Sequence, residues 1–186
     1  NLNEKEWPKI DVGVNKLSNA KIFIDDTAGA KIADIQSKAK KLKAKCDDLG
    51  LIVIDYLQLM QSDKHTDNRV LEIGDISRGL KIMAKELAVP VICCAQLSRA
   101  SESRNDKTPM LSDLRDSGAI EQDADTVIFL YRSEYYKTDD AAGQDTSIAE
   151  VIIAKNRHGS TGTVNMGWNG QFTKFVTIAD DRDVGV

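Results

Sequence analysis

Two polar residues that directly follow apolar runs are the first candidates for chemistry in this sequence. Asp55 comes after the run at residues 51–54, and Gln96 comes after a second run at residues 91–95. A carboxylate at a strand end can orient a magnesium ion that bridges phosphate oxygens, and an amide can hydrogen-bond both a phosphate oxygen and a water molecule. Simpler roles stay open for both, because Asp55 could cap the next turn and Gln96 could be an ordinary polar strand end.

The apolar pattern predicts the elements that position these side chains. Spacings of three and four residues predict amphipathic helices at residues 32–49 and 70–87, the second ending near Val89 because a residue before proline disfavours the helical region. Apolar runs predict strands, and ligands in open α/β sheets bind beyond the carboxyl ends of such strands. The predicted strands are residues 21–24, 51–54, 91–95, 126–131 and 148–154.

The end of the chain has a different pattern. Asn169 and Gly170 give the strongest short hairpin signal, joining strands at residues 163–168 and 172–178. Alternating strands and helices with an antiparallel ending predict an α/β fold, with a mostly parallel sheet, helices on both faces and a C-terminal hairpin. A length of 186 residues is enough for one domain with a sizeable core, so a single domain over residues 1–186 is expected.

Composition and charge exclude several classes of protein. Hydrophobic residues make up 41% and charged residues 29% of the sequence, as in folded soluble proteins rather than disordered or membrane proteins. No apolar run approaches the roughly 18 to 20 residues of a membrane span, and no signal-peptide pattern is present, so a cytoplasmic protein with no membrane partner is expected. The net charge of -4 argues against a surface that coats nucleic acid everywhere, but it is compatible with a local basic channel.

Other metal or redox chemistry finds little support in the sequence. His65 and His158 are far apart and lack a ligand pattern. Asp25 and Asp26 could join Asp55 in a metal-dependent hydrolase, but no matching histidine or glutamate set accompanies them, and turn formation explains Asp25 and Asp26 equally well. The three cysteines include an adjacent pair inside an apolar run, which predicts reduced thiols.

Four longer segments occur in order along the chain: LIVIDYLQLM at 51–60, VPVICCAQLSR at 89–99, LSDLRDSG with IEQDAD at 111–125, and IAKNRHGSTG at 153–162. Together they resemble the DnaB family of replicative DNA helicases. The resemblance extends from about residue 16 to residue 180, nearly the whole chain. It implies a RecA-like P-loop NTPase core that uses ATP and Mg²⁺, binds single-stranded DNA and assembles as a homohexamer. It also implies contacts with primase and a helicase loader, through regions mostly outside this chain.

The same resemblance implies roles for individual residues. Asp55 matches the magnesium-orienting acid of the Walker B motif, and Gln96 matches the phosphate-sensing glutamine of the family. Lys155 and Arg157 match the pair that reaches from one subunit to the nucleotide of its neighbour, and a permanently charged guanidinium suits the charge that builds up on a transferred phosphoryl group. Without the resemblance, Lys155 and Arg157 are better explained as solvated charges at a strand end.

The turn at residues 115–118 matches a family loop that lines the central channel and touches the DNA backbone. This turn could bond phosphates through the Arg115 guanidinium and through its backbone amides. Gly118 would allow a sharp approach of the backbone to the phosphates. Asp116 would repel phosphate unless its carboxylate faces away.

The sequence lacks one motif that a nucleotide motor needs. The pattern G-x-x-x-x-G-K-[ST], whose amides and lysine hold phosphates, occurs nowhere in it. We therefore expect an N-terminally truncated motor domain with unpaired strand edges and no ATPase activity by itself. Two competing functions remain open: a RecA-like recombinase that forms filaments, and a non-catalytic DNA-binding or assembly module.

Overall fold

The computed structural model describes residues 3, 6–46, 48–63, 66, 68–98, 102–136 and 146–178. Its helices are α1 Trp7–Ser18, α2 Ile32–Lys45, α3 Arg69–Leu87 and α4 Gly118–Asp123, with 3-10 helices η1 Leu57–Leu59, η3 Leu111–Ser117 and η4 Ser133–Tyr136. Its strands are β1 Ile52–Ile54, β2 Val91–Cys93, β3 Thr126–Tyr131, β4 Thr146–Asn156, β5 Gly162–Asn169 and β6 Lys174–Val176. Among these residues, no helix is long and apolar enough to span a membrane.

The strands form two sheets. β1 and β2 pair in parallel, with Ile52 opposite Val91 and Ile54 opposite Cys93, and β3 to β6 form an antiparallel sheet in chain order. The α/β class is thus as expected, but the antiparallel part is larger than the predicted C-terminal hairpin because β3 also pairs antiparallel with β4. An apolar run indicates how deeply a strand is buried, but it does not select the neighbour with which the strand pairs.

The predicted second helix is confirmed as α3, and local residues set its ends. The Asn68 side chain accepts hydrogen bonds from the amides of Val70 and Leu71, at 3.0 and 3.4 Å, which satisfies donors that have no partner inside the helix. The helix stops at Ala88, which is left-handed at φ 50°, and Pro90 follows. The first predicted helix is confirmed as α2, although it ends four residues earlier than the expected residue 49.

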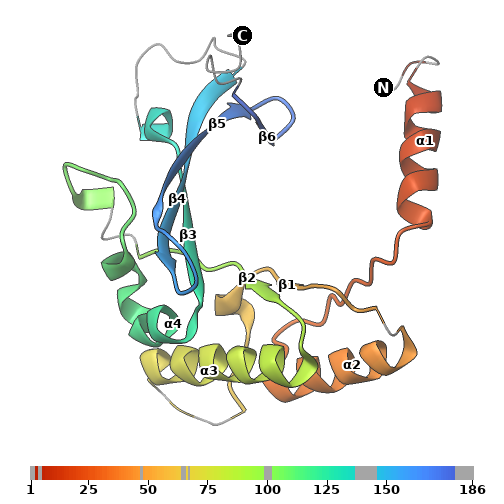
Figure 1. The fold of residues 1–186 in the computed structure, drawn as a ribbon, viewed down its shortest axis with the longest axis vertical. Helices are drawn as coiled ribbons and strands as arrows, with labels where there is room; N and C mark the ends of the chain where they lie inside the picture. Colours follow the sequence, from red (N-terminus) through yellow and green to blue (C-terminus); the bar gives the residue numbers. More distant parts are fainter. Residues whose placement is uncertain are drawn as a thin grey trace.

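One face of α3 forms the larger core, against α2 and the β1–β2 pair (Figure 1). Ile76 and Met83 are fully buried there, and burying such a side chain contributes about 1.5–3 kcal/mol. The opposite face of β1–β2 is open, since Val53 and Ile92 are more than half exposed. Helices on both faces were expected, but within the described residues they cover only this one.

A smaller core fixes the antiparallel sheet to the loops before it. Val127 and Phe129 of β3 pack with Leu114 of η3, and Ile152 of β4 contacts this cluster. β3 alternates strictly between buried and exposed residues, the pattern of a strand covered on one face only. α4 joins the two cores, because it contacts both α3 and η3.

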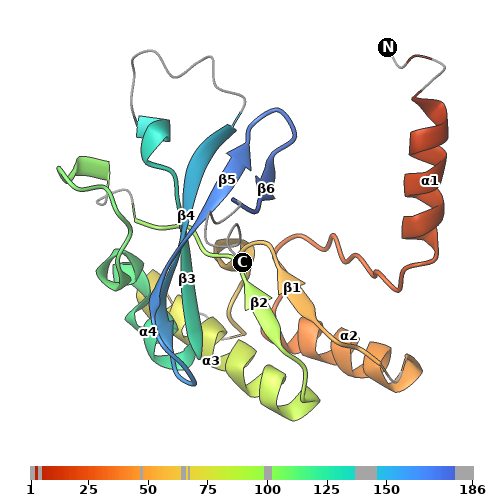
Figure 2. The same ribbon diagram turned by 45° about the horizontal axis from the view of Figure 1, so that its top comes forward.

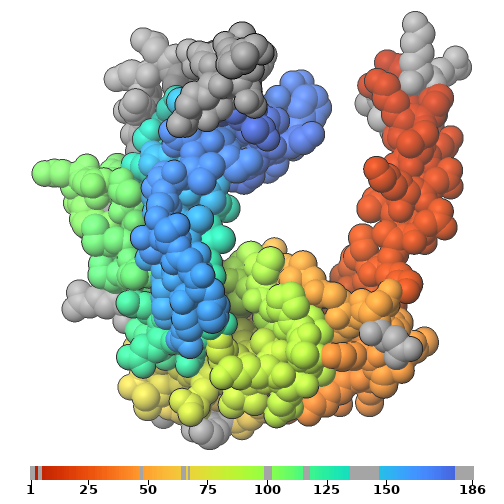
Figure 3. Space-filling view, in the orientation of Figure 1, coloured from red at the N-terminus to blue at the C-terminus, as the bar shows by residue number. Residues whose placement is uncertain are grey.

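Helix α1 was not predicted, and it stands apart from the rest of the molecule (Figure 2). It has no buried residue, and Trp7, Val14 and Leu17 are each more than half exposed. Figure 3 shows a wide hollow between α1 and the strands β5 and β6. The spacing of these apolar residues was a helical signal in the sequence.

Two other expectations of secondary structure are wrong. Residues 21–24 form no strand, and Ile22, Phe23 and Ile24 are exposed. The hairpin between β5 and β6 exists, but its loop covers residues 170–173 instead of turning at Asn169 and Gly170, and Thr173 is the residue with positive φ, at 51°. A strand needs a neighbour, and a turn is set by strand register, so neither follows from local sequence alone.

Candidate functional site

The carboxyl ends of β1 and β2 meet at one edge of the parallel pair. Ile54 and Cys93 are the last paired residues, and the amide of Cys94 then donates to the carbonyl of Ile54 at 2.9 Å. Asp55 follows β1 directly, Gln96 follows shortly after β2, and both residues are exposed. The structure therefore brings these two sequence-predicted residues to the same edge.

Asp55 is the carboxylate at this edge that could hold a magnesium ion. Among the described residues there is no group of three or more His, Cys, Asp or Glu that could hold a metal by itself. Magnesium is commonly bound by one or two carboxylates together with substrate phosphates and water, so a single exposed carboxylate fits an ion that arrives with a nucleotide. Asp25 is engaged elsewhere, with Lys38 and Thr27 each at 2.7 Å, which supports its reading as a turn residue.

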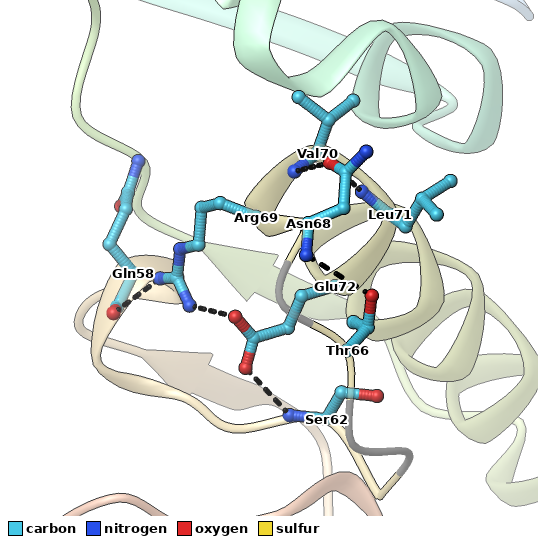
Figure 4. A network of polar contacts seen from close by, with 8 residues as sticks. All are labelled: Gln58, Ser62, Thr66, Asn68, Arg69, Val70, Leu71 and Glu72. Carbon is cyan, nitrogen blue, oxygen red and sulfur yellow. Dashed lines mark hydrogen bonds and ion pairs between the residues drawn. The ribbon is translucent and has the colours of Figure 1, made fainter.

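A hydrogen-bond network around Gln58 joins this edge to the start of α3 (Figure 4). The Gln58 side chain accepts from the Gln96 amide at 3.2 Å and donates to the Gln96 carbonyl at 3.0 Å. Arg69 donates to the Gln58 carbonyl at 2.7 Å and to the Glu72 carboxylate at 2.6 Å. Glu72 also accepts from the Ser62 amide at 3.3 Å. The Arg69 guanidinium, and then this amide, hold the pKa of Glu72 below its usual range.

A cleft of ≈ 340 Å³ lies beside the network, between the first turns of α3, residues 96–98 and η3. Asp113 on its wall is only 6% exposed, and the guanidinium of Arg104 bonds both of its carboxylate oxygens at 2.8 Å. The amide of Ser98 donates to the Asp113 carbonyl at 3.2 Å. These bonds fix the segment that follows Gln96 against η3.

The candidate DNA-contacting turn begins at the end of η3. The side chains of Arg115 and Asp116 lie outside the described residues, so their contacts with DNA stay predictions. Gly118 has φ −50° and ψ −23°, an ordinary helical conformation that any residue adopts. A Cβ at this position would meet nothing within 4 Å, which leaves open space beside the backbone.

Lys155 and Arg157 lie together where β4 ends, against the end of α4. The Lys155 ammonium donates to the carbonyl of Glu121, and Arg157 donates to the carbonyl of Gln122 at 3.1 Å. The Arg157 guanidinium is also 3.6 Å from the carboxylate of Asp125. Both cations thus point back onto their own chain, although the Arg157 side chain remains 47% exposed.

A basic cleft of ≈ 240 Å³ opens beside Arg157. Its lining includes the cationic side chains of Arg78, Lys81, Lys85 and Arg157. Asp123 also lines the cleft, and Asp125 lies beside it as a second counter-charge, whose pKa is held below the usual range first by Lys81 and then, more weakly, by Arg157. Among the described residues, no hydrogen bond or ion pair connects this cleft with Asp55 or Gln96. The structure therefore forms two separate pairs of predicted residues.

Comparison with known proteins decides the family. A family model described as the DnaB-like helicase C terminal domain matches residues 1–177. This chain belongs to the DnaB-like helicase C-terminal domain family. The replicative DNA helicase DnaC of Bacillus subtilis (strain 168) is 49% identical over 179 residues, and the replicative DNA helicase DnaB of Geobacillus stearothermophilus is 49% identical over 178 residues. These alignments cover 96% and 95% of this chain, but in each case 38% of the relative.

Solved structures agree with the DnaB-like assignment. A DnaB-like replicative helicase, studied together with its interactions with primase, superimposes with a TM-score of 0.88 at 43% identity, over 96% of this chain and 42% of that one. A second solved structure, that of an ATPase domain, gives the same TM-score and identity over 96% of this chain and 62% of that one. The expected RecA-like α/β fold is therefore confirmed.

Three polar residues near the candidate site of this DnaB-like domain were not predicted from the sequence: Gln58, Arg69 and Arg104. Gln58 had a weak signal, since it is the one polar residue in the stretch 57–60. Its partner Gln96 is 38 positions away, and Arg104 is nine positions from Asp113. Contacts of this kind depend on how the loops pack and leave no periodic pattern.

Proposed function

We propose that this chain is part of the ATPase motor of a ring-shaped replicative DNA helicase, which hydrolyses ATP at subunit interfaces to move along single-stranded DNA and unwind duplex. The observation that carries the proposal is the match of nearly the whole chain, at 47–49% identity, to replicative helicases. Because the chain spans only 38–39% of their length, the activity belongs to the whole protein.

Asp55 and Gln96 act on the same nucleotide in this proposal. The Asp55 carboxylate orients Mg²⁺, which supplies charge neutralisation at the phosphate oxygens when it is bound. The Gln96 amide hydrogen-bonds the terminal phosphate or the attacking water. Their common edge in the β1–β2 pair supports both roles, since ligands of open α/β sheets bind beyond the carboxyl ends of the strands.

Lys155 and Arg157 complete the site of a neighbouring subunit. Two observations support this: Arg157 lines a basic cleft, and the contacts of the described residues do not connect Lys155 or Arg157 with Asp55 or Gln96. A residue that acts on a neighbour requires a head-to-tail interface, and such interfaces close into a ring when the rotation permits, here a homohexamer. ATP hydrolysis then depends on assembly.

The remaining roles concern DNA and protein partners. Arg115 and the open backbone at Gly118 contact DNA phosphates in the central channel, with Asp116 turned away from them. Primase and a helicase loader bind mostly through parts of the protein outside this chain, which acts in the cytoplasm. The lysine and amides that hold the phosphates also lie outside it, so this chain alone is expected to hydrolyse ATP no faster than background.

Two other functions are less well supported. A filament-forming recombinase would share the fold, but fold alone does not carry function, and the relatives with high identity are replicative helicases. A non-catalytic assembly module would have no need of an exposed carboxylate and an amide at one strand edge.

Subunit mixing tests the proposal. Full-length Arg157→Ala is mixed with full-length protein that is disabled only at its phosphate-loop lysine, under conditions where rings exchange subunits. If Arg157 acts on the neighbour, mixed rings contain interfaces with an intact loop and an intact arginine, and ATPase activity partly returns. A linked dimer with one functional interface provides the control, because only one orientation of the two substitutions should be active. Equal activity of both orientations would contradict the proposal.

A further inference from the structure

Gln58 is a polar residue at the β1–β2 edge to which no function has been assigned so far. We propose that Gln58 is a positioning residue, whose side-chain amide fixes the main chain of Gln96 so that the Gln96 side chain can face the nucleotide phosphates. The inference rests on the proposed role of Gln96. It adds a residue that touches neither phosphate nor metal and acts only through Gln96.

The geometry at the strand ends carries the inference. Beyond the last paired residues, the amide of Leu57 donates to the carbonyl of Cys94 at 2.9 Å, which ends the main-chain contact between the two segments. Further along, the Gln58 side chain contacts the main chain of Gln96. It accepts a hydrogen bond from the Gln96 amide at 3.2 Å and donates one to the Gln96 carbonyl at 3.0 Å. A side-chain amide has the donor and the acceptor that this two-point contact requires.

These two bonds satisfy both main-chain polar groups of Gln96. Among the described residues, no other hydrogen bond to these groups is present. The next fixed point is Ser98, whose amide donates to Asp113. The segment is therefore held at alternate residues, at Cys94, Gln96 and Ser98, and the Gln58 contact is the middle one.

Gln58 can impose a position because it is itself immobilised. Its neighbours Leu57 and Met60 are 2% and 4% exposed, so η1 is anchored in the larger core. Its carbonyl accepts from Arg69 at 2.7 Å, and Arg69 bonds Glu72 within the first turn of α3. Figure 4 shows these links running from Gln58 to the helix start. Gln58 and Arg69 therefore tie the main chain of Gln96 to α3, the most buried helix of the fold.

The test removes the two bonds in the full-length protein. Gln58→Met keeps a long unbranched side chain but has no strong donor or acceptor. The matched control is Gln36→Met, which removes a glutamine whose side chain bonds Glu86 on an exposed surface away from η1. Hydrogen exchange of the peptide that contains Gln96, measured by mass spectrometry, reports the position of the main chain independently of activity.

We expect Gln58→Met to speed exchange at Gln96, to lower the kcat for DNA-stimulated ATP hydrolysis by about tenfold, and to change the KM for ATP by less than about twofold. Gln36→Met should change neither exchange nor turnover. Unchanged exchange at Gln96 in Gln58→Met would overturn the inference, whatever happens to activity.

A double-mutant cycle separates this inference from the proposed role of Gln96. If Gln58 acts through Gln96, then Gln58→Met has no further effect on kcat in a Gln96→Met protein. Fully additive losses would overturn the inference, as would full activity of Gln58→Met beside an inactive Gln96→Met. If Gln96→Met itself retains full turnover, the sensor role of Gln96 fails and the catalytic part of the inference fails with it. The exchange result then decides alone whether Gln58 fixes this strand end.

Discussion

The two halves of the candidate site are held in different ways. At the β1–β2 edge, Gln96 is fixed by its own chain through Gln58, which Arg69 ties to α3. At the end of β4, Lys155 and Arg157 bond carbonyls at the end of α4, and Arg157 also pairs with the partly exposed Asp125; their side chains make no other bond among the described residues. The first half is organised by hydrogen bonds that tie it to α3, whereas the second half consists of cations that, among the described residues, no hydrogen bond or ion pair connects with the first.

This difference fits a motor that fires only when subunits are assembled. In the proposed motor, the preorganised edge would read the nucleotide, and the guanidinium of Arg157 would exchange a carbonyl and a partly exposed carboxylate for a phosphate at little cost, because ion pairs near the surface are weak. The comparison predicts that substitutions in the two halves have different effects. Four substitutions test it, in order of decreasing expected effect.

Arg157→Ala should have the largest effect. In the full-length protein we expect nucleotide binding within about threefold of the unsubstituted protein, but a loss of about a thousandfold in kcat, the scale on which removing such an arginine acts in NTPases. Binding of a fluorescent ATP analogue and steady-state ATPase rates measure the two effects. Lys40→Ala, which breaks an exposed pair with Glu86, is the control and should retain both. A large loss of nucleotide affinity with Arg157→Ala would remove the distinction between the two halves.

Arg104→Met should act on stability instead. It leaves the buried Asp113 carboxylate without its two charge-assisted bonds, so we expect a loss of about 2 kcal/mol in the free energy of unfolding. Thermal denaturation of the full-length protein should show the motor domain melting several degrees lower. Lys40→Met should change the melting temperature little, since both partners of that pair are about half exposed. Equal shifts for both variants would mean that Asp113 does not need Arg104.

Arg115→Ala tests a third region, the end of η3, which is proposed to contact DNA and not the nucleotide. We expect weaker binding of single-stranded DNA by a similar factor for different sequences, and a salt dependence that is flatter by up to about one unit of slope. Fluorescence anisotropy at several salt concentrations measures both quantities. A loss restricted to one base composition would indicate base recognition instead of phosphate contact.

Asp25→Asn should have the smallest effect of the four substitutions. Its effect is on stability, and it depends on pH. Lys38, followed by Thr27, lowers the pKa of Asp25 to about 2. Because this pKa is depressed in the folded state, the stabilisation is complete above the unfolded value near 4 and is lost as the pH falls towards 2. Asp25→Asn should therefore reduce stability slightly at pH 7 and reduce its loss between pH 4 and pH 2. Acid unfolding curves measure this, with Asp11→Asn on the exposed surface of α1 as the control.

A fifth contrast concerns two adjacent thiols at the β1–β2 edge. Burial raises the pKa of Cys93 to about 12, while Cys94 is exposed. The thiolate is the reactive form, so Cys93 should be alkylated much more slowly than Cys94 in the folded full-length protein. Mass spectrometry after timed iodoacetamide treatment distinguishes the two, and equal rates would mean that the edge opens.

The sequence by itself determined the features that depend on neighbouring residues. It predicted α2 and α3 from apolar spacing, β1 and β2 from apolar runs, and the positions of Asp55 and Gln96 just after those strands. Caps and breakers such as Asn68 and Pro90 act over a few residues, so a short window of sequence contains the information that sets a helix end. The order of the four motifs was also readable directly, and it indicated the family that the comparisons support.

Only the tertiary structure decided which segments meet. It paired β3 with β4, left residues 21–24 without a strand partner, lengthened the loop between β5 and β6, and placed Gly118 in a helical conformation. It also brought Gln58 to Gln96 across 38 positions of the chain. The physical reason is the same in each case: the partners in strand pairing and in side-chain hydrogen bonds are distant in sequence. The local apolar pattern indicates whether a residue is buried, but it does not determine which segment buries it.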